Sequence, residues 1–154
     1  MKKFLLVTLC GVLGLSLTGC SSSKEVELDV NEVYDEILSD YAKDEVAMTQ
    51  ELDEEMLKNL YQLDDTLIEQ YVATVPMMSA NIDETIIVEA KEGKVEEVED
   101  KILARQQQLL NSAFYPELVS LVEEYSISIQ GNYIIFAVGN NAPAFVDAFN
   151  EYFK

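Results

Sequence analysis

The side chains that could do chemistry in this 154-residue sequence are mainly carboxyl groups, because it has 29 acidic residues and no histidine. Without histidine, an imidazole base and histidine metal ligands are excluded. The two thiols belong to Cys10 and Cys20. With 10 basic residues the formal net charge is −19, and such a chain lacks the clustered Lys and Arg that nucleic-acid binding requires. We therefore expect no nucleic-acid partner.

Paired carboxyl groups are the machinery of glycoside hydrolases, in which an acid and a base or nucleophile flank a cleft. Pairs such as Asp64-Asp65 and Glu96-Glu97 arise here from the acidic composition, and no Trp is present to line a saccharide cleft. No G-x-S-x-G motif and no phosphate-binding glycine loop occurs. The sequence therefore assigns no catalytic residue, and a small enzyme that uses carboxylates is kept as an alternative.

Oxygen ligands for calcium are plentiful, but the D-x-D-x-D-G spacing of a calcium loop is absent. Asp53-Glu54-Glu55 stands at the expected start of a helix, where the helix dipole already accounts for acidic residues. The sequence thus predicts no metal ligand and no cofactor. A cation-dependent adhesion or assembly domain is a further alternative.

The first 19 residues have the organisation of a secretory signal peptide. Lys2 and Lys3 supply positive charge, and a largely apolar stretch follows over residues 4–17. This stretch ends before it reaches the about 20 residues that a membrane-spanning helix needs. We expect residues 1–19 to be removed.

Leu17, Thr18, Gly19 and Cys20 together resemble the bacterial lipobox. The resemblance implies cleavage by signal peptidase II between Gly19 and Cys20 and a diacylglycerol thioether on the Cys20 sulfur. Cys10 leaves with the signal peptide, so no disulfide is expected. Two or three acyl chains, palmitate among them, attach a protein stably where a single chain is marginal. We expect a lipoprotein at the extracytoplasmic face of the cell membrane, with the membrane as a partner through the lipid.

Residues 20–28 are interpreted as the lipidated cysteine and a tether, since Ser21 to Glu27 lacks hydrophobic periodicity. About eight residues reach at most roughly 25 to 30 Å. Removal of Lys2 and Lys3 makes the net charge more negative than −19, and anionic lipid repels such a surface. The folded part is therefore expected to stand off the membrane.

A single α+β domain is expected over residues 29–154, because the chain is too short for two domains. Apolar spacing predicts helices that begin near Val30, Asp53, Val95, Pro116 and Asn141. Residues 69–75 and 85–90 read as strands, as do the runs on either side of Gly131-Asn132. The predicted order is ααββααββα, with a four-stranded, mostly antiparallel sheet of two hairpins and helices mostly on one face.

The Gly131-Asn132 turn is the most specific structural signal, because a two-residue hairpin loop fixes the pairing register. It places Ile129 opposite Ile134 and Ile127 opposite Phe136. The other face of the first strand would carry Ser126, Ser128 and Gln130, as in a sheet that is covered on one side.

Several segments along the chain together suggest a family. They are the lipobox, the acidic first helix, Leu52 to Tyr61, Tyr71-Val72 followed by Val75-Pro76-Met77-Met78, the Ile86 strand, Lys91 to Lys94 with Gln106 to Gln108, and Gly131-Asn132-Tyr133. With these segments the chain resembles the lipoproteins of the domain of unknown function 4358 family, which occur chiefly in Firmicutes, roughly from Val30 to Lys154. The resemblance implies no activity and transfers no functional residue except Cys20, and Gln62 stands where that family's turn is expected to have a glycine.

The resulting interpretation is a non-enzymatic, lipid-anchored binding or accessory module that acts through protein or small-ligand contacts. Met77-Met78 is either part of a binding surface or strand-edge packing. Neither the ligand nor the partner follows from the sequence.

Overall fold

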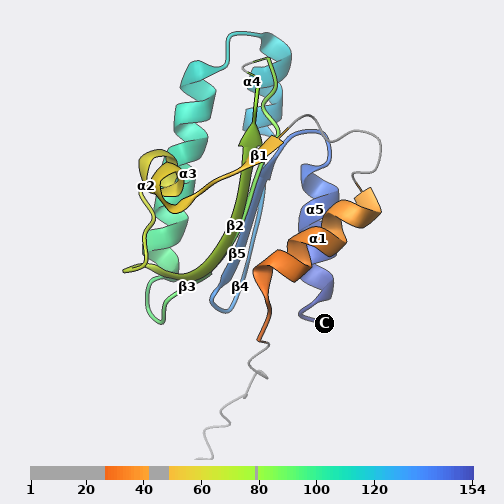
Figure 1. Ribbon diagram of the computed structural model, residues 1–154. Coiled ribbons are helices and arrows are strands. Elements are labelled where there is room, and N and C mark those ends of the chain that lie inside the picture. The colour runs from red at the N-terminus through yellow and green to blue at the C-terminus, as the bar shows by residue number, and fades with distance from the viewer. Residues whose placement is uncertain (1–26, 42–48, 79) are drawn as a thin grey trace, which may run out of the picture.

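The computed structural model describes residues 27–41, 49–78 and 80–154 of the chain (Figure 1). These residues form the expected α+β fold. In chain order the elements are α1 (Val30–Tyr41), β1 (Thr49–Glu51), α2 (Glu54–Tyr61), β2 (Ile68–Pro76), β3 (Glu84–Ala90), α3 (Val95–Ser112), α4 (Pro116–Glu123), β4 (Ser126–Gln130), β5 (Tyr133–Val138) and α5 (Ala142–Glu151). No helix in this part of the chain has the length and apolar character needed to cross a membrane.

Within the described residues the sheet has five antiparallel strands in the order β1-β2-β3-β5-β4, so the prediction of four strands is wrong. The two expected hairpins, β2–β3 and β4–β5, are present, and β3 pairs with β5 to join them. The additional strand is β1, whose residues 49–51 pair with residues 74–76 at the sheet edge. Its three residues, Thr-Gln-Glu, are too few and too polar to show strand alternation.

The register predicted for the β4–β5 hairpin is confirmed. Ile129 lies opposite Ile134, and Ile127 lies opposite Phe136. Gly131 has φ +62°, the left-handed conformation that two-residue hairpin turns require and that glycine adopts without strain.

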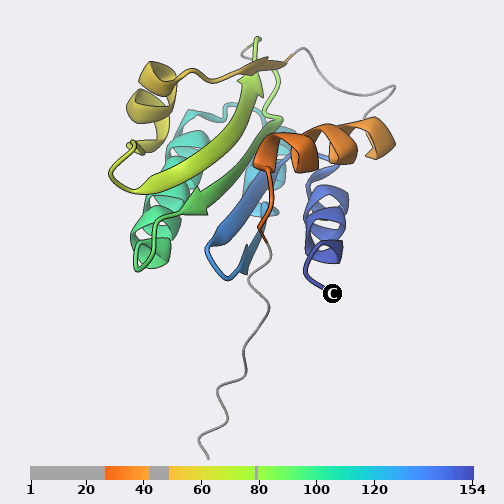
Figure 2. The same cartoon turned by 60° about the horizontal axis from the view of Figure 1, so that its bottom comes forward.

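Helices cover both faces of the sheet, so the expectation that they lie mostly on one face is wrong (Figures 1 and 2). One core contains Tyr61 of α2 and Ile102 of α3, and the other contains Phe149 of α5. The cause is visible in β5, where every residue from 133 to 138 is buried. A run of consecutive apolar residues supplies both faces of a strand, which then needs a cover on each side.

The polar side of β4 is therefore covered as well. The Ser128 hydroxyl donates to Asn150 Oδ1 of α5 at 2.6 Å, and Gln130 Nε2 donates to the same oxygen at 3.0 Å. The predicted polar face is correct in its residues, but it contacts a helix.

The start of the described chain is held at one end of the sheet. The Leu28 N–H donates to the Tyr133 hydroxyl (3.1 Å), and its carbonyl accepts from Gln70 Nε2 (2.7 Å). Tyr133 is the first residue of β5 and pairs with Glu89 near the end of β3. The seven residues of β3 span about 20 Å, so the start of β3 and the end of β5 lie about that far from Leu28.

Candidate functional site

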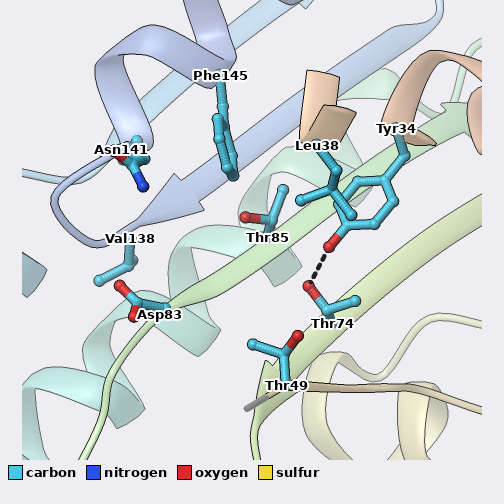
Figure 3. Close-up of a pocket in the computed structure, with 10 residues that line it drawn as sticks. Tyr34, Leu38, Thr49, Thr74, Asp83, Thr85, Val138, Asn141 and Phe145 are labelled. Carbon is cyan, nitrogen blue, oxygen red and sulfur yellow. Dashed lines mark hydrogen bonds between the residues drawn. The ribbon is translucent and has the colours of Figure 1, made fainter. Parts of the chain in front are cut away.

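A small pocket lies between α1, α5 and the sheet (Figure 3). Thr85 and Val138 place it at the start of β3 and the end of β5, which is the sheet end far from Leu28. Its volume is about 30 Å³, which is more than one water molecule needs and suits a group of one or two heavy atoms. Its lining residues come from the first, middle and last parts of the sequence: Tyr34, Leu38, Thr49, Thr74, Asp83, Thr85, Val138, Asn141, Ala142 and Phe145.

Two threonines that face each other on β2 and β3 form the polar floor of this pocket. Thr74 and Thr85 are paired in the sheet and are only 5% and 6% exposed. The hydroxyls of Tyr34 and Thr74 share a hydrogen bond of 2.8 Å, and burial raises the pKa of the Tyr34 phenol. This is the only hydrogen bond between the residues drawn in Figure 3. The polar groups of Asp83, Thr85 and Asn141 therefore surround the pocket without bonding one another.

Asp83 stands directly before β3, with its carboxyl group half-buried at the pocket. Burial raises its pKa, while the hydrogen bond with Asn81 acts in the opposite direction. Gly139, with φ +125°, makes room for this carboxyl, because a Cβ there would lie 2.0 Å from Asp83 Oδ1. Asn81 Oδ1 accepts the N–H groups of Ile82 (2.7 Å) and Asp83 (3.1 Å), which holds the chain at the strand start.

The next residue, Glu84, points to the opposite face of the sheet and is fully engaged there. Arg105 of α3 donates from Nε to Oε1 and from Nη2 to Oε2, each at 2.8 Å, and the Tyr61 hydroxyl donates to Oε1 at 2.6 Å. Glu84 is 1% exposed, and burial raises the pKa of Tyr61 well above its ordinary value. This bidentate, charge-assisted arrangement ties α2 and α3 to the sheet.

A second cavity, of about 480 Å³, lies between α2 and β2. Its carboxyl groups come from Glu54, Glu55, Asp64, Asp65 and Glu69. The pKa of Asp64 is lowered to about 2 by the Thr66 hydroxyl and by Lys58, whose Nζ lies 3.1 Å from Oδ2. We call this cavity the acidic groove. Within the described residues, no group of three His, Cys, Asp or Glu side chains is placed to hold a metal ion.

The candidate residues from the sequence fall outside the Asp83 pocket. Leu17, Thr18, Gly19 and Cys20 lie outside the described residues. Met77 and Met78 are 60% and 52% exposed after β2, so they are not core residues.

Of the two carboxylate pairs noted in the sequence, Asp64-Asp65 lies in the acidic groove and Glu96-Glu97 in the first turn of α3. Sequence reasoning missed Asp83. Its only signal is the alternation of a strand, which sends Asp83 and Glu84 to opposite faces.

Comparison with protein families finds a match to a model described as a domain of unknown function, DUF4358, over residues 40–139. The chain belongs to the DUF4358 family. The matched range contains all five strands together with α2, α3 and α4, and therefore Asp83, Glu84 and Gly139. No curated protein and no solved structure matches the chain.

Gln62 stands where the turn of a DUF4358 domain was expected to have a glycine, and its backbone conformation explains that expectation. Gln62, at the C-terminal cap of α2, has φ 57° and ψ 30°, and its N–H donates to the Lys58 carbonyl. This left-handed cap favours glycine, since a side chain there is strained.

Proposed function

We propose that this DUF4358 protein is a non-enzymatic binding protein, anchored by lipid at the extracytoplasmic face of the cell membrane, whose ligand occupies the pocket at Asp83. The observation that carries the binding role is the half-buried carboxyl group of Asp83 beside the Thr85 hydroxyl, because neither group bonds another residue drawn at the pocket. The Asp83 carboxyl bonds Asn81, outside the pocket lining, and among the described residues no cation pairs with it, so it can still accept hydrogen bonds from a ligand in the pocket.

The position of the pocket supports this role. Lipidation of Cys20 places the membrane before the tether, and the tether joins the domain at Leu28. The pocket lies at the other end of β3 and β5, about 20 Å further away. The pocket would then face away from the membrane, toward ligands outside the cell.

In the Asp83 pocket, the number of carboxyl groups favours binding over hydrolysis. Glycoside hydrolysis needs two carboxyl groups about 5 to 9.5 Å apart in one cleft. The pocket has one, Asp83, and Asp64, whose pKa is shifted the other way, lies in the acidic groove. One carboxyl group with a few hydroxyls also falls short of the six to eight oxygen ligands that calcium takes.

The anchor is tested by metabolic labelling with a palmitate analogue in a bacterial host. We expect the unaltered protein to carry the label and to sediment with membranes, and Cys20→Ala to do neither. Cys10→Ala is the matched control, because it removes the other thiol and should leave labelling unchanged. A labelled, membrane-bound Cys20→Ala protein would contradict the proposed anchor.

The orientation is tested with fluorophores on single introduced cysteines in the lipidated protein bound to vesicles. Asn132→Cys lies in the β4–β5 turn near Leu28, and Met77→Cys lies just beyond β2 at the pocket end. We expect quenchers in the lipid headgroups to act more strongly at residue 132 than at residue 77. Equal or reversed quenching would mean that the pocket does not face away from the membrane.

A further inference from the structure

We propose that the Asp83 pocket binds a primary ammonium group carried on an unbranched alkyl chain, a ligand class that rests on the proposed binding function. The inference follows from four properties of the pocket. These are its charge, its hydrogen-bonding groups, its apolar wall and its size.

The pocket has one negative charge and, among the described residues, no cation paired with it. The ion pairs in this part of the chain engage other carboxylates, namely those of Asp64, Glu84, Glu97 and Glu151. Arg105 is committed on the other face of the sheet, where it binds Glu84 through two nitrogens. A half-buried carboxylate of this kind gains most from a cationic ligand.

The first turn of α5 gives an anion little to bind. The Ala142 N–H already donates to the Gly139 carbonyl at 3.2 Å, and Pro143 has no N–H. The Asp83 carboxylate at the same place would repel an anion. The helix start therefore does not reverse the preference that Asp83 sets.

The hydrogen-bonding groups match the three donors of a primary ammonium group. Asp83 supplies a carboxylate oxygen, and Thr85, which is 6% exposed, supplies a hydroxyl oxygen directed into the pocket (Figure 3). Asn141 caps α5 by position but forms no side-chain capping bond, and Figure 3 draws its amide nitrogen toward the pocket. A half-turn of this amide would present its oxygen as a third acceptor beside those of Asp83 and Thr85.

Apolar side chains complete the pocket and select what carries the charge. Leu38 and Phe145, which come from α1 and α5, pack in the same core on this face of the sheet. Such a wall suits methylene groups, since it cannot hydrogen-bond. A volume of about 30 Å³ accepts the nitrogen and its first carbon but not a nitrogen with four methyl groups.

The test is methyl NMR of the full mature lipoprotein in nanodiscs, with labelled Thr and Leu methyl groups. We expect saturable shifts of the Thr85 and Leu38 methyls with methylammonium and n-butylammonium chloride. Tetramethylammonium chloride and potassium chloride at the same ionic strength should leave them unshifted. A capped tripeptide with a central Lys, compared with n-butylammonium, distinguishes a protein lysine from a free amine as the source of the group.

Variants connect the shifts to the named residues. Asp83→Asn should weaken n-butylammonium binding at least about tenfold, because it removes a charge-assisted hydrogen bond. Thr85→Val, which keeps the shape but loses the hydroxyl, should weaken it several-fold. Asp65→Asn is the matched control, since it removes the same charge in the acidic groove and should change nothing.

The opposing results separate the two proposals. Equal shifts with tetramethylammonium or potassium, or full binding by Asp83→Asn, would overturn the ammonium assignment. Saturable shifts with n-butanol and none with n-butylammonium would overturn it but keep the pocket as a binding site. If no probe shifts the pocket methyls, both the ligand class and the pocket's binding role are wrong.

Discussion

Arg105→Met should be strongly destabilising, because it leaves the buried Glu84 carboxylate without its cation. The side chain of Glu84 is 0% exposed and that of Arg105 14%, so water cannot replace the guanidinium. Two hydrogen bonds of 2.8 Å are lost, and only the Tyr61 hydroxyl still donates to the carboxylate. Removing one partner of a buried ion pair costs about 3–5 kcal/mol.

That cost is a large part of the about 5–15 kcal/mol by which domains are stable. In a domain of this size, we expect the melting temperature to fall by about 10–20 °C. The unpaired Glu84 of the variant should have a raised pKa, since burial disfavours its charge. A raised folded-state pKa means that stability returns as the pH falls, so the loss should be smaller at pH 5 than at pH 8.

The assay is urea unfolding followed by circular dichroism at both pH values, on the mature protein in detergent. Lys94→Met is the control, because it removes a cation of the same helix region whose pair with Glu97 is exposed and worth about 0–1 kcal/mol. Adding Glu84→Gln to Arg105→Met should recover stability, since no buried charge is then left. The reasoning is refuted if Arg105→Met costs no more than Lys94→Met, or if its cost does not depend on pH.

Three further predictions concern single positions. Asp83→Asn should raise the melting temperature at pH 7 and raise it less at pH 4. The pKa of Asp83 is raised in the folded protein, so its ionised form destabilises the fold. An unchanged melting temperature at both pH values would contradict this. Gly139→Ala should cost about 1–3 kcal/mol in urea unfolding, since φ +125° strains alanine and its Cβ meets Asp83, and a neutral effect would contradict that contact. Gln62→Gly should instead add about 0.5–1 kcal/mol, because glycine adopts the left-handed cap without strain, and a loss of stability would argue against this conformation.

Features that depend on a few neighbouring residues were predictable from the sequence. The Gly131-Asn132 turn fixes the β4–β5 register locally, and Asp53 caps α2 as expected by accepting the Met56 N–H at 2.8 Å. Both interactions span only a few positions along the chain, so their residue types carry the information.

Features that depend on distant partners were not predictable in the same way. Residues 49–51 become a strand only because β2 offers an edge more than twenty positions later. The prediction placed helices mostly on one face, because the polar side of β4 suggested an open face, whereas the apolar residues Ile134, Ile135 and Phe136 of β5 are all buried and need cover on both sides. That polar side is satisfied by one residue of α5, Asn150, which no local pattern identifies.

The pocket shows the same limit at the level of single charges. Asp83 and Glu84 are adjacent and chemically similar. They differ because the alternation of side chains along a strand sends them to opposite faces of the sheet. Glu84 receives two donors from Arg105 and one from Tyr61, so its charge serves to hold helices against the sheet. Asp83 keeps a half-buried carboxyl group whose charge costs stability. A charge that weakens the fold and faces a pocket is typical of a binding residue, because functional sites are where stability is sacrificed.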